Sequence, residues 1–136
     1  MKQLIIALTY LTLSTTFYAQ QAQVESVNPK IIEVFADKTQ ELILDNPDRL
    51  ALYNDFLENR VRVIESQKSG DDKFIKLSSV SLMNKYNATL TRDLVFDPNN
   101  FNPLKYALDI LPKTTMIYRV DNTNYLIVIQ PQTLNK

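Results

Sequence analysis

The chain has 136 residues, with 15 basic and 15 acidic side chains, one glycine, and no cysteine, histidine or tryptophan. This length fits a single domain. The missing residue types exclude disulfides, thiolate nucleophiles, imidazole general bases and the usual zinc and iron–sulfur sites. The balanced charge argues against nucleic-acid binding, which requires a basic surface.

The amino terminus predicts a secretory signal peptide over residues 1–19, with Lys2 followed by an apolar run over residues 4–13. Ten helical residues rise about 15 Å, half of the hydrocarbon core of about 30 Å, so this run is too short to span a bilayer. Cleavage is expected after Ala19 or, because Phe17 occupies a position that favours a small residue, after Ala22. An exported chain without cysteine points to the bacterial periplasm, with secretion as the alternative and no membrane span in the mature chain.

After a polar lead-in over residues 20–29, the pattern predicts two helices. The first covers residues 30–45 and is interrupted near residue 37, where polar residues separate two apolar groups. The second begins with Asn46 as the cap and Pro47 at the first helical position, and ends near Asn59.

The middle of the chain predicts a β-hairpin of residues 61–65 and 74–77, joined by a polar loop that contains the single glycine. A short helix from Ser78 or Ser79 through Tyr86 is expected to follow. Residues 94–96 then predict a short strand.

The last third predicts a helix over residues 103–111, capped by Asn102, and a second hairpin of residues 116–120 and 125–129. The final strand is apolar on both faces and should therefore be central in the sheet. The expected fold class is α+β: one small domain over residues 30–131, with two amino-terminal helices, mixed strands in two hairpins, short helices packed on the sheet, and a tail over residues 132–136.

Residues 94–129 resemble the βαββ half of the STN-type domain found at the start of secretins and TonB-dependent transducers. The matching residues are Pro103-Leu104, Ala107-Leu108, and Tyr118 to Asn122 leading into Ile127-Val128-Ile129. The resemblance implies a small envelope module that docks on other proteins. The Ala-Gln sequence at the end of the signal peptide and the high content of Asn and Ile also resemble those of small exported proteins of Bacteroidota. This resemblance implies a periplasmic part of an outer-membrane machine, such as the type IX secretion apparatus.

Carboxylates supply the remaining candidates for catalysis or metal binding. The pairs are Asp71–Asp72, Asp45–Asp48 and Asp93–Asp97. Turn and capping roles explain each pair, and the acidic and amide residues between Asp93 and Asn102 lack the spacing of a calcium-binding loop. We therefore expect no catalytic residue, no metal and no cofactor.

The remaining candidate is a partner-binding surface on the last helix and hairpin. Tyrosine and arginine are favoured interface residues, whereas the alternative places the tyrosine rings over the core with only their hydroxyls in water. The candidate residues are Tyr118, Arg119, Tyr125, Tyr106 and Phe101. An exposed strand edge beside them is a further candidate for binding a partner strand.

The sequence therefore predicts a non-enzymatic periplasmic module that binds a protein partner in the cell envelope, as an accessory or assembly factor of a complex such as a protein-secretion machine. The alternative is a small-ligand binder that takes peptidoglycan or glycan fragments on its aromatic and Asn side chains. A third hypothesis, a hydrolase that uses carboxylates alone, depends on Asp71 and Asp72.

Overall fold

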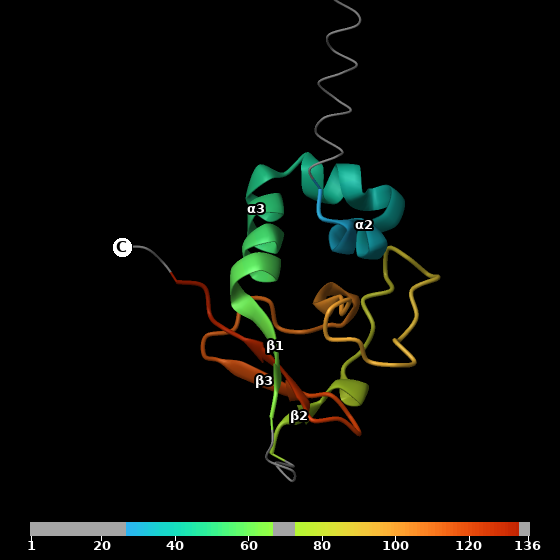
Figure 1. The fold of residues 1–136 in the computed structure, drawn as a ribbon. Helices are drawn as coiled ribbons and strands as arrows, with labels where there is room; N and C mark the ends of the chain where they lie inside the picture. The colour runs from blue at the N-terminus through green and yellow to red at the C-terminus, as the bar shows by residue number, and fades with distance from the viewer. Residues whose placement is uncertain (1–26, 67–72, 134–136) are drawn as a thin grey trace, which may run out of the picture.

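The computed structural model describes residues 27–66 and 73–133; the predicted signal peptide lies outside these residues. Two helices lie together on one side of the molecule, a four-stranded mixed sheet lies on the other, and most of residues 80–115 runs between them (Figure 1). The predicted α+β class is confirmed.

The first helical region is interrupted, as predicted. Helix α2 (Pro29–Phe35) begins where the Oδ1 of Asn28 accepts a hydrogen bond from the Lys30 N–H at 3.0 Å, and it ends at Ala36, which has φ 47° and ψ −125°. A 3-10 turn (Ala36–Lys38) and a π-helical turn (Gln40–Leu44) follow. Val27 is also buried, so the core includes part of the segment predicted as a lead-in.

Helix α3 (Pro47–Asp55) begins as predicted, with the Oδ1 of Asn46 accepting a hydrogen bond from the Arg49 N–H at 3.2 Å. A π-helical turn (Phe56–Arg60) extends it and leads directly into the first strand (Figure 1). The helical segment thus ends one residue beyond the predicted Asn59.

The sheet contains β1 (Val61–Glu65), β2 (Ile75–Lys76), β3 (Met116–Arg119) and β4 (Tyr125–Ile129) in the order β1-β4-β3-β2. Strand β4 is central and antiparallel to both neighbours, so its predicted position and the second hairpin are confirmed. The first predicted hairpin is wrong, because β1 pairs with β4 while β2 pairs in parallel with β3. The two strands occupy opposite edges of the sheet, since the apolar β4 provides β1 with a long central partner.

The segment between β2 and β3 contains less regular structure than predicted. A 3-10 turn (Leu77–Ser79) replaces the expected short helix, and a second one (Pro103–Lys105) replaces the helix over residues 103–111, although the predicted Asn102 cap is present. The chain leaves the helix because the Ala107 N–H donates to the Ser81 carbonyl at 2.8 Å and the Met83 N–H donates to the Lys105 carbonyl at 2.7 Å. These cross-segment bonds replace helical ones.

Only one face of the sheet packs against the core. Val61, Val63, Tyr118, Ile127 and Ile129 belong to the core cluster or pack against it, together with residues of α2 and of the segment between the layers. The alternating residues point the other way. We call them the outer sheet face; they are Arg62, Ile64, Lys76, Ile117, Arg119, Leu126 and Val128.

Candidate functional site

Three of the five predicted partner-binding residues lie in the core. Tyr118, Tyr106 and Phe101 are each 4% exposed. The ring centroids of Phe101 and Tyr106 are 5.6 Å apart, and the Tyr118 hydroxyl accepts a hydrogen bond from the Asp109 N–H at 3.4 Å. Because their rings fill the space between sheet and helices, these side chains do not form the surface that the sequence predicted.

The other two predicted residues are partly accessible but lie on different sides of the sheet. Tyr125 points toward the core side, where its ring packs against Phe96 with centroids 5.4 Å apart. Arg119 belongs to the outer sheet face, and its Nη1 donates to the Thr123 carbonyl at 3.4 Å. The register pairs Tyr118 with Ile127, so the two hairpin tyrosines are diagonal neighbours on one face and Arg119 points away from both.

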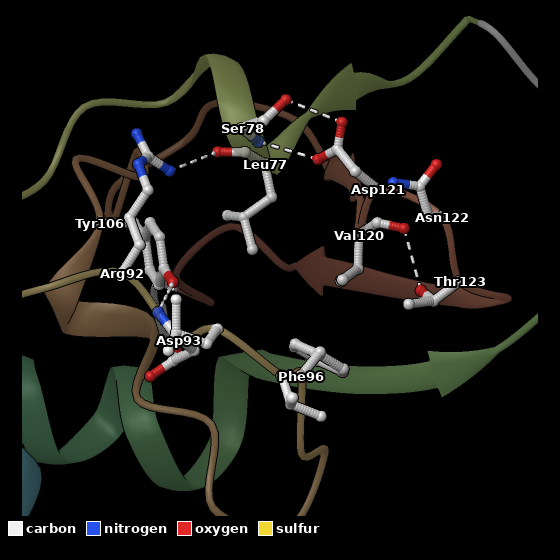
Figure 2. A pocket seen from close by; sticks show the side chains of 12 residues that line it. Leu77, Ser78, Arg92, Asp93, Phe96, Tyr106, Val120, Asp121, Asn122 and Thr123 are labelled. Carbon is white, nitrogen blue, oxygen red and sulfur yellow. Dashed lines mark hydrogen bonds between the residues drawn. The ribbon is translucent and has the colours of Figure 1, made fainter.

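The structure instead brings three other segments together around a groove of about 420 Å³ (Figure 2). One wall is the end of β2 with Leu77 and Ser78, the second is the loop over residues 92–96, and the third is the β3–β4 turn over residues 120–123. The side chains of Leu77, Val120 and Tyr106 are buried and form its apolar interior.

The turn that joins β3 to β4 is fixed to the end of β2 by Asp121. Its Oδ2 accepts a hydrogen bond from the Ser78 N–H at 2.9 Å and its Oδ1 accepts one from the Ser78 hydroxyl at 2.7 Å (Figure 2). Partial burial by itself raises the pKa of Asp121, but the two bonds from Ser78 outweigh it and lower the pKa below its ordinary value. The adjacent Asn122 has a positive φ of 56°, a conformation that asparagine tolerates.

The opposite wall is anchored by charged side chains. The Arg92 guanidinium donates to the carbonyls of Leu77 and Val80 and lies over the Tyr106 ring, 5.6 Å from its centroid. Asp93 accepts from Lys105 at 2.5 Å and from the Tyr106 hydroxyl at 3.1 Å. Burial raises the pKa of the Tyr106 hydroxyl, and the hydrogen bond with the Asp93 backbone opposes this rise only in part.

Leu94 and Val95 lie in the loop between Asp93 and Phe96, and their side chains project into water. Leu94 is fully exposed and Val95 is 83% exposed, whereas the next residue, Phe96, is partly buried against Phe101. The predicted strand over residues 94–96 is wrong, because the chain bends here without a strand partner. Two adjacent exposed apolar side chains at the rim of a groove are typical of an interaction site.

Two cations that were not predicted from the sequence are buried, and each joins separate segments of the chain. Lys105 is 7% exposed and is also 3.8 Å from Glu33. Arg60 is 4% exposed, and it donates to Asp55 and to the Ile110 carbonyl, both at 2.6 Å. The sequence gives little indication that these two side chains are buried. Each follows residues with a helical pattern, and lysine and arginine in such positions are ordinarily solvated.

Three of the carboxylates considered as catalytic or metal-binding candidates have hydrogen-bonding roles within the fold. Asp93 pairs with Lys105, Asp97 accepts hydrogen bonds from Asn99 and Asn100 in its own turn, and Asp45 accepts one from Gln40. Within residues 27–66 and 73–133, no three acidic side chains form a group able to hold a metal ion. Asp71 and Asp72 lie outside the described residues.

Among the helices that the structure describes, none has the length and apolar character needed to cross a bilayer. Comparisons of the chain with protein-family models, curated proteins and solved structures gave no match.

Proposed function

We propose that this chain is a non-enzymatic protein-interaction module that binds its partner at the groove beside Leu94 and Val95. The observation that carries the proposal is the exposure of these two apolar side chains on a loop that is anchored at Asp93 and Phe96. A partner that covers them removes apolar surface from water, and the anchored loop loses little conformational freedom on binding.

The predicted signal peptide and the absence of cysteine favour the bacterial periplasm as the location of this module, and a role as an accessory or assembly factor of an envelope complex. The resemblance of residues 94–129 to STN-type domains favours the same kind of role. A protein-secretion machine such as the type IX apparatus is the kind of assembly that we propose.

The test uses the tagged full-length chain expressed in its own envelope. The double variant Leu94→Asp/Val95→Asp should fold normally, because both side chains are exposed, and should lose a stoichiometric partner that the wild type retains. Leu111→Asp is the matched control, since Leu111 is an exposed leucine outside the groove. Equal recovery of the same partner by the double variant contradicts the proposal.

The second candidate, a binder of glycan fragments, is favoured by the polar groups that line the same groove, among them Arg92, Asp121 and Asn122, beside the Phe96 ring. Its volume of about 420 Å³ lies within the range of about 300–1,000 Å³ of small-molecule sites. Titration with peptidoglycan fragments distinguishes the two: saturable shifts of the Asn122 and Thr123 amide signals favour the ligand, and unchanged spectra favour the protein partner.

A further inference from the structure

The edge strand β1 lies at the end of the sheet opposite to β2. We propose that β1 binds an extended segment of another protein, which adds a strand with apolar side chains toward the core and acidic side chains on the outer sheet face. This proposal goes beyond the function proposed above, because it uses different residues on the other edge of the sheet.

The pairing of β1 with β4 shows which backbone groups point outward. The Ser66 N–H donates to the Asn124 carbonyl at 2.7 Å, and the Gln130 N–H donates to the Arg60 carbonyl at 2.9 Å. In an antiparallel pair the bonded residues alternate, so Arg62 and Ile64 also bond to β4, whereas Val61, Val63 and Glu65 direct their backbone groups away from it. The Val61 N–H is used by the Phe56 carbonyl. Val63 therefore presents both a donor and an acceptor at the edge.

A hollow of about 250 Å³ lies beside this edge, on the core side of the sheet. It is lined by Lys30, Leu57, Val61, Val63, Pro98, Asn99, Phe101 and Pro103. Side chains of an added strand that lie opposite Val61 and Val63 share their face and point toward this hollow. Its volume is below the range of about 300–1,000 Å³ of small-molecule sites, so it has room for one or two side chains of a bound strand. Its lining combines the apolar Leu57, Val61 and Val63 with polar groups.

The positive charge on the outer sheet face indicates which side chains the added strand should place on that face. Arg62 is exposed on β1, and Lys76 and Arg119 lie on the same face, whereas the strands that the structure describes place no acidic residue there. The remaining members of this face are aliphatic. A residue of the added strand beside Arg62 therefore favours a carboxylate, so the expected partner segment alternates apolar and acidic residues.

The edge lacks two of the features that natural proteins use to block strand addition, although it carries the charged residues Arg62 and Glu65. Strand β1 contains no proline and pairs with β4 in continuous register over its five residues, without a bulge. Ile64 is 44% exposed on the outer sheet face. A regular edge with an adjacent hollow is suited to strand addition, in which backbone bonds give affinity and alternate pockets give specificity.

The experiment titrates the isotope-labelled full-length chain with a capped peptide that alternates Val and Glu over about seven residues, enough to span β1. We expect saturable shifts of the Val63 and Glu65 amide signals and slower hydrogen exchange at both. The peptide that alternates Val and Lys should bind about two- to fivefold more weakly, as expected for one exposed charge pair. Absence of shifts at Val63 and Glu65 with the Val–Glu peptide overturns the proposal.

Two variants test the geometry. Val63→Pro removes the outward N–H without removing a bond to β4, and it should abolish peptide binding. Arg62→Glu should invert the preference between the two peptides, whereas Lys113→Glu, the same charge change at an exposed site outside the sheet, should leave it unchanged. An unchanged preference in Arg62→Glu overturns the proposal even if the proline variant does not fold.

The measurements also separate this proposal from its alternatives. A second copy of the chain at the edge would make the molecular mass in solution rise with protein concentration. It would also protect the Val63 and Glu65 amides from hydrogen exchange without peptide. These two results together overturn the assignment to a strand of another protein. Leu94→Asp/Val95→Asp should bind the Val–Glu peptide like the wild type, so failure of the groove proposal and failure of the edge proposal give different results.

Discussion

The ammonium group of Lys105 lies 2.5 Å from the Oδ1 of Asp93, and this contact joins a buried 3-10 turn to the loop that exposes Leu94 and Val95. The lysine is nearly enclosed, while the Asp93 side chain is 30% exposed. The loop thus presents apolar residues to water from a fixed base.

Replacing Asp93 with alanine should lower the free energy of unfolding by about 1–3 kcal/mol, because a buried ammonium and the Tyr106 hydroxyl both lose a charged partner. Urea denaturation measures the change. Asp97→Ala is the control, since the hydrogen bonds of Asp97 stay within its own turn and its loss should cost less. Equal effects of the two substitutions would mean that the Lys105–Asp93 contact does not hold the loop.

The stability of the fold should depend on pH through Asp121. Its pKa in the folded chain is lower than the ordinary carboxyl value of 3.8, so its ionised form stabilises the fold above that value. This contribution should be lost as the pH falls below 3.8 and through the folded pKa. Asp121→Asn should reduce the slope of unfolding free energy against pH in this range, whereas Asp37→Asn, on an exposed side chain far from Ser78, should have a smaller effect. Identical slopes in wild type and Asp121→Asn contradict this prediction.

Ala36 occupies a backbone conformation that glycine adopts more easily, with φ 47° and ψ −125°. Ala36→Gly should therefore raise the free energy of unfolding by about 1 kcal/mol, because relief of the steric strain exceeds the entropy that glycine loses on folding. Thermal and urea unfolding measure the gain. Asn122→Gly is the comparison: its φ of 56° suits asparagine, so we expect little change. Destabilisation by Ala36→Gly would contradict the strained conformation.

Substitutions of Tyr118 and Leu94 should distinguish a core residue from an interface residue. Tyr118→Ala should cost about 3–5 kcal/mol of unfolding free energy, as expected for a fully buried aromatic ring. Leu94→Ala should change it by about 0.5 kcal/mol or less, because the side chain is fully exposed, and should weaken partner binding instead. Chemical denaturation and partner recovery give the two readouts. A small cost for Tyr118→Ala would show that its ring does not stabilise the core.

Local signals in the sequence predicted the elements whose stability is local. The Asn46-Pro47 pair that begins α3 satisfies the first free N–H groups of a helix, so this boundary was predicted from the residues alone. The Asn28-Pro29 pair begins α2 in the same way, although the prediction assigned it to the lead-in. The hairpin of β3 and β4 and the central position of β4 also followed from the apolar runs and the polar turn between them.

Periodicity failed where distant backbone groups competed for the same hydrogen bonds. Residues 103–111 have a helical apolar spacing, but Ala107 and Lys105 bond to the segment over residues 81–83 instead. In the same way, residues 94–96 are typical of a strand, yet they pair with no strand among the described residues, and Leu94 and Val95 point into water. Local spacing carries no information on which remote carbonyl is within reach.

The sequence by itself determined the α+β class, the start of α3, the last hairpin and the residue types that are missing, because each follows from composition or from contacts between near neighbours. Only the tertiary structure decided that β1 and β2 lie at opposite edges, that Tyr106 and Tyr118 are core residues, and that Leu94 and Val95 are exposed. These outcomes depend on competition among residues far apart in the chain for a central strand and a limited core volume.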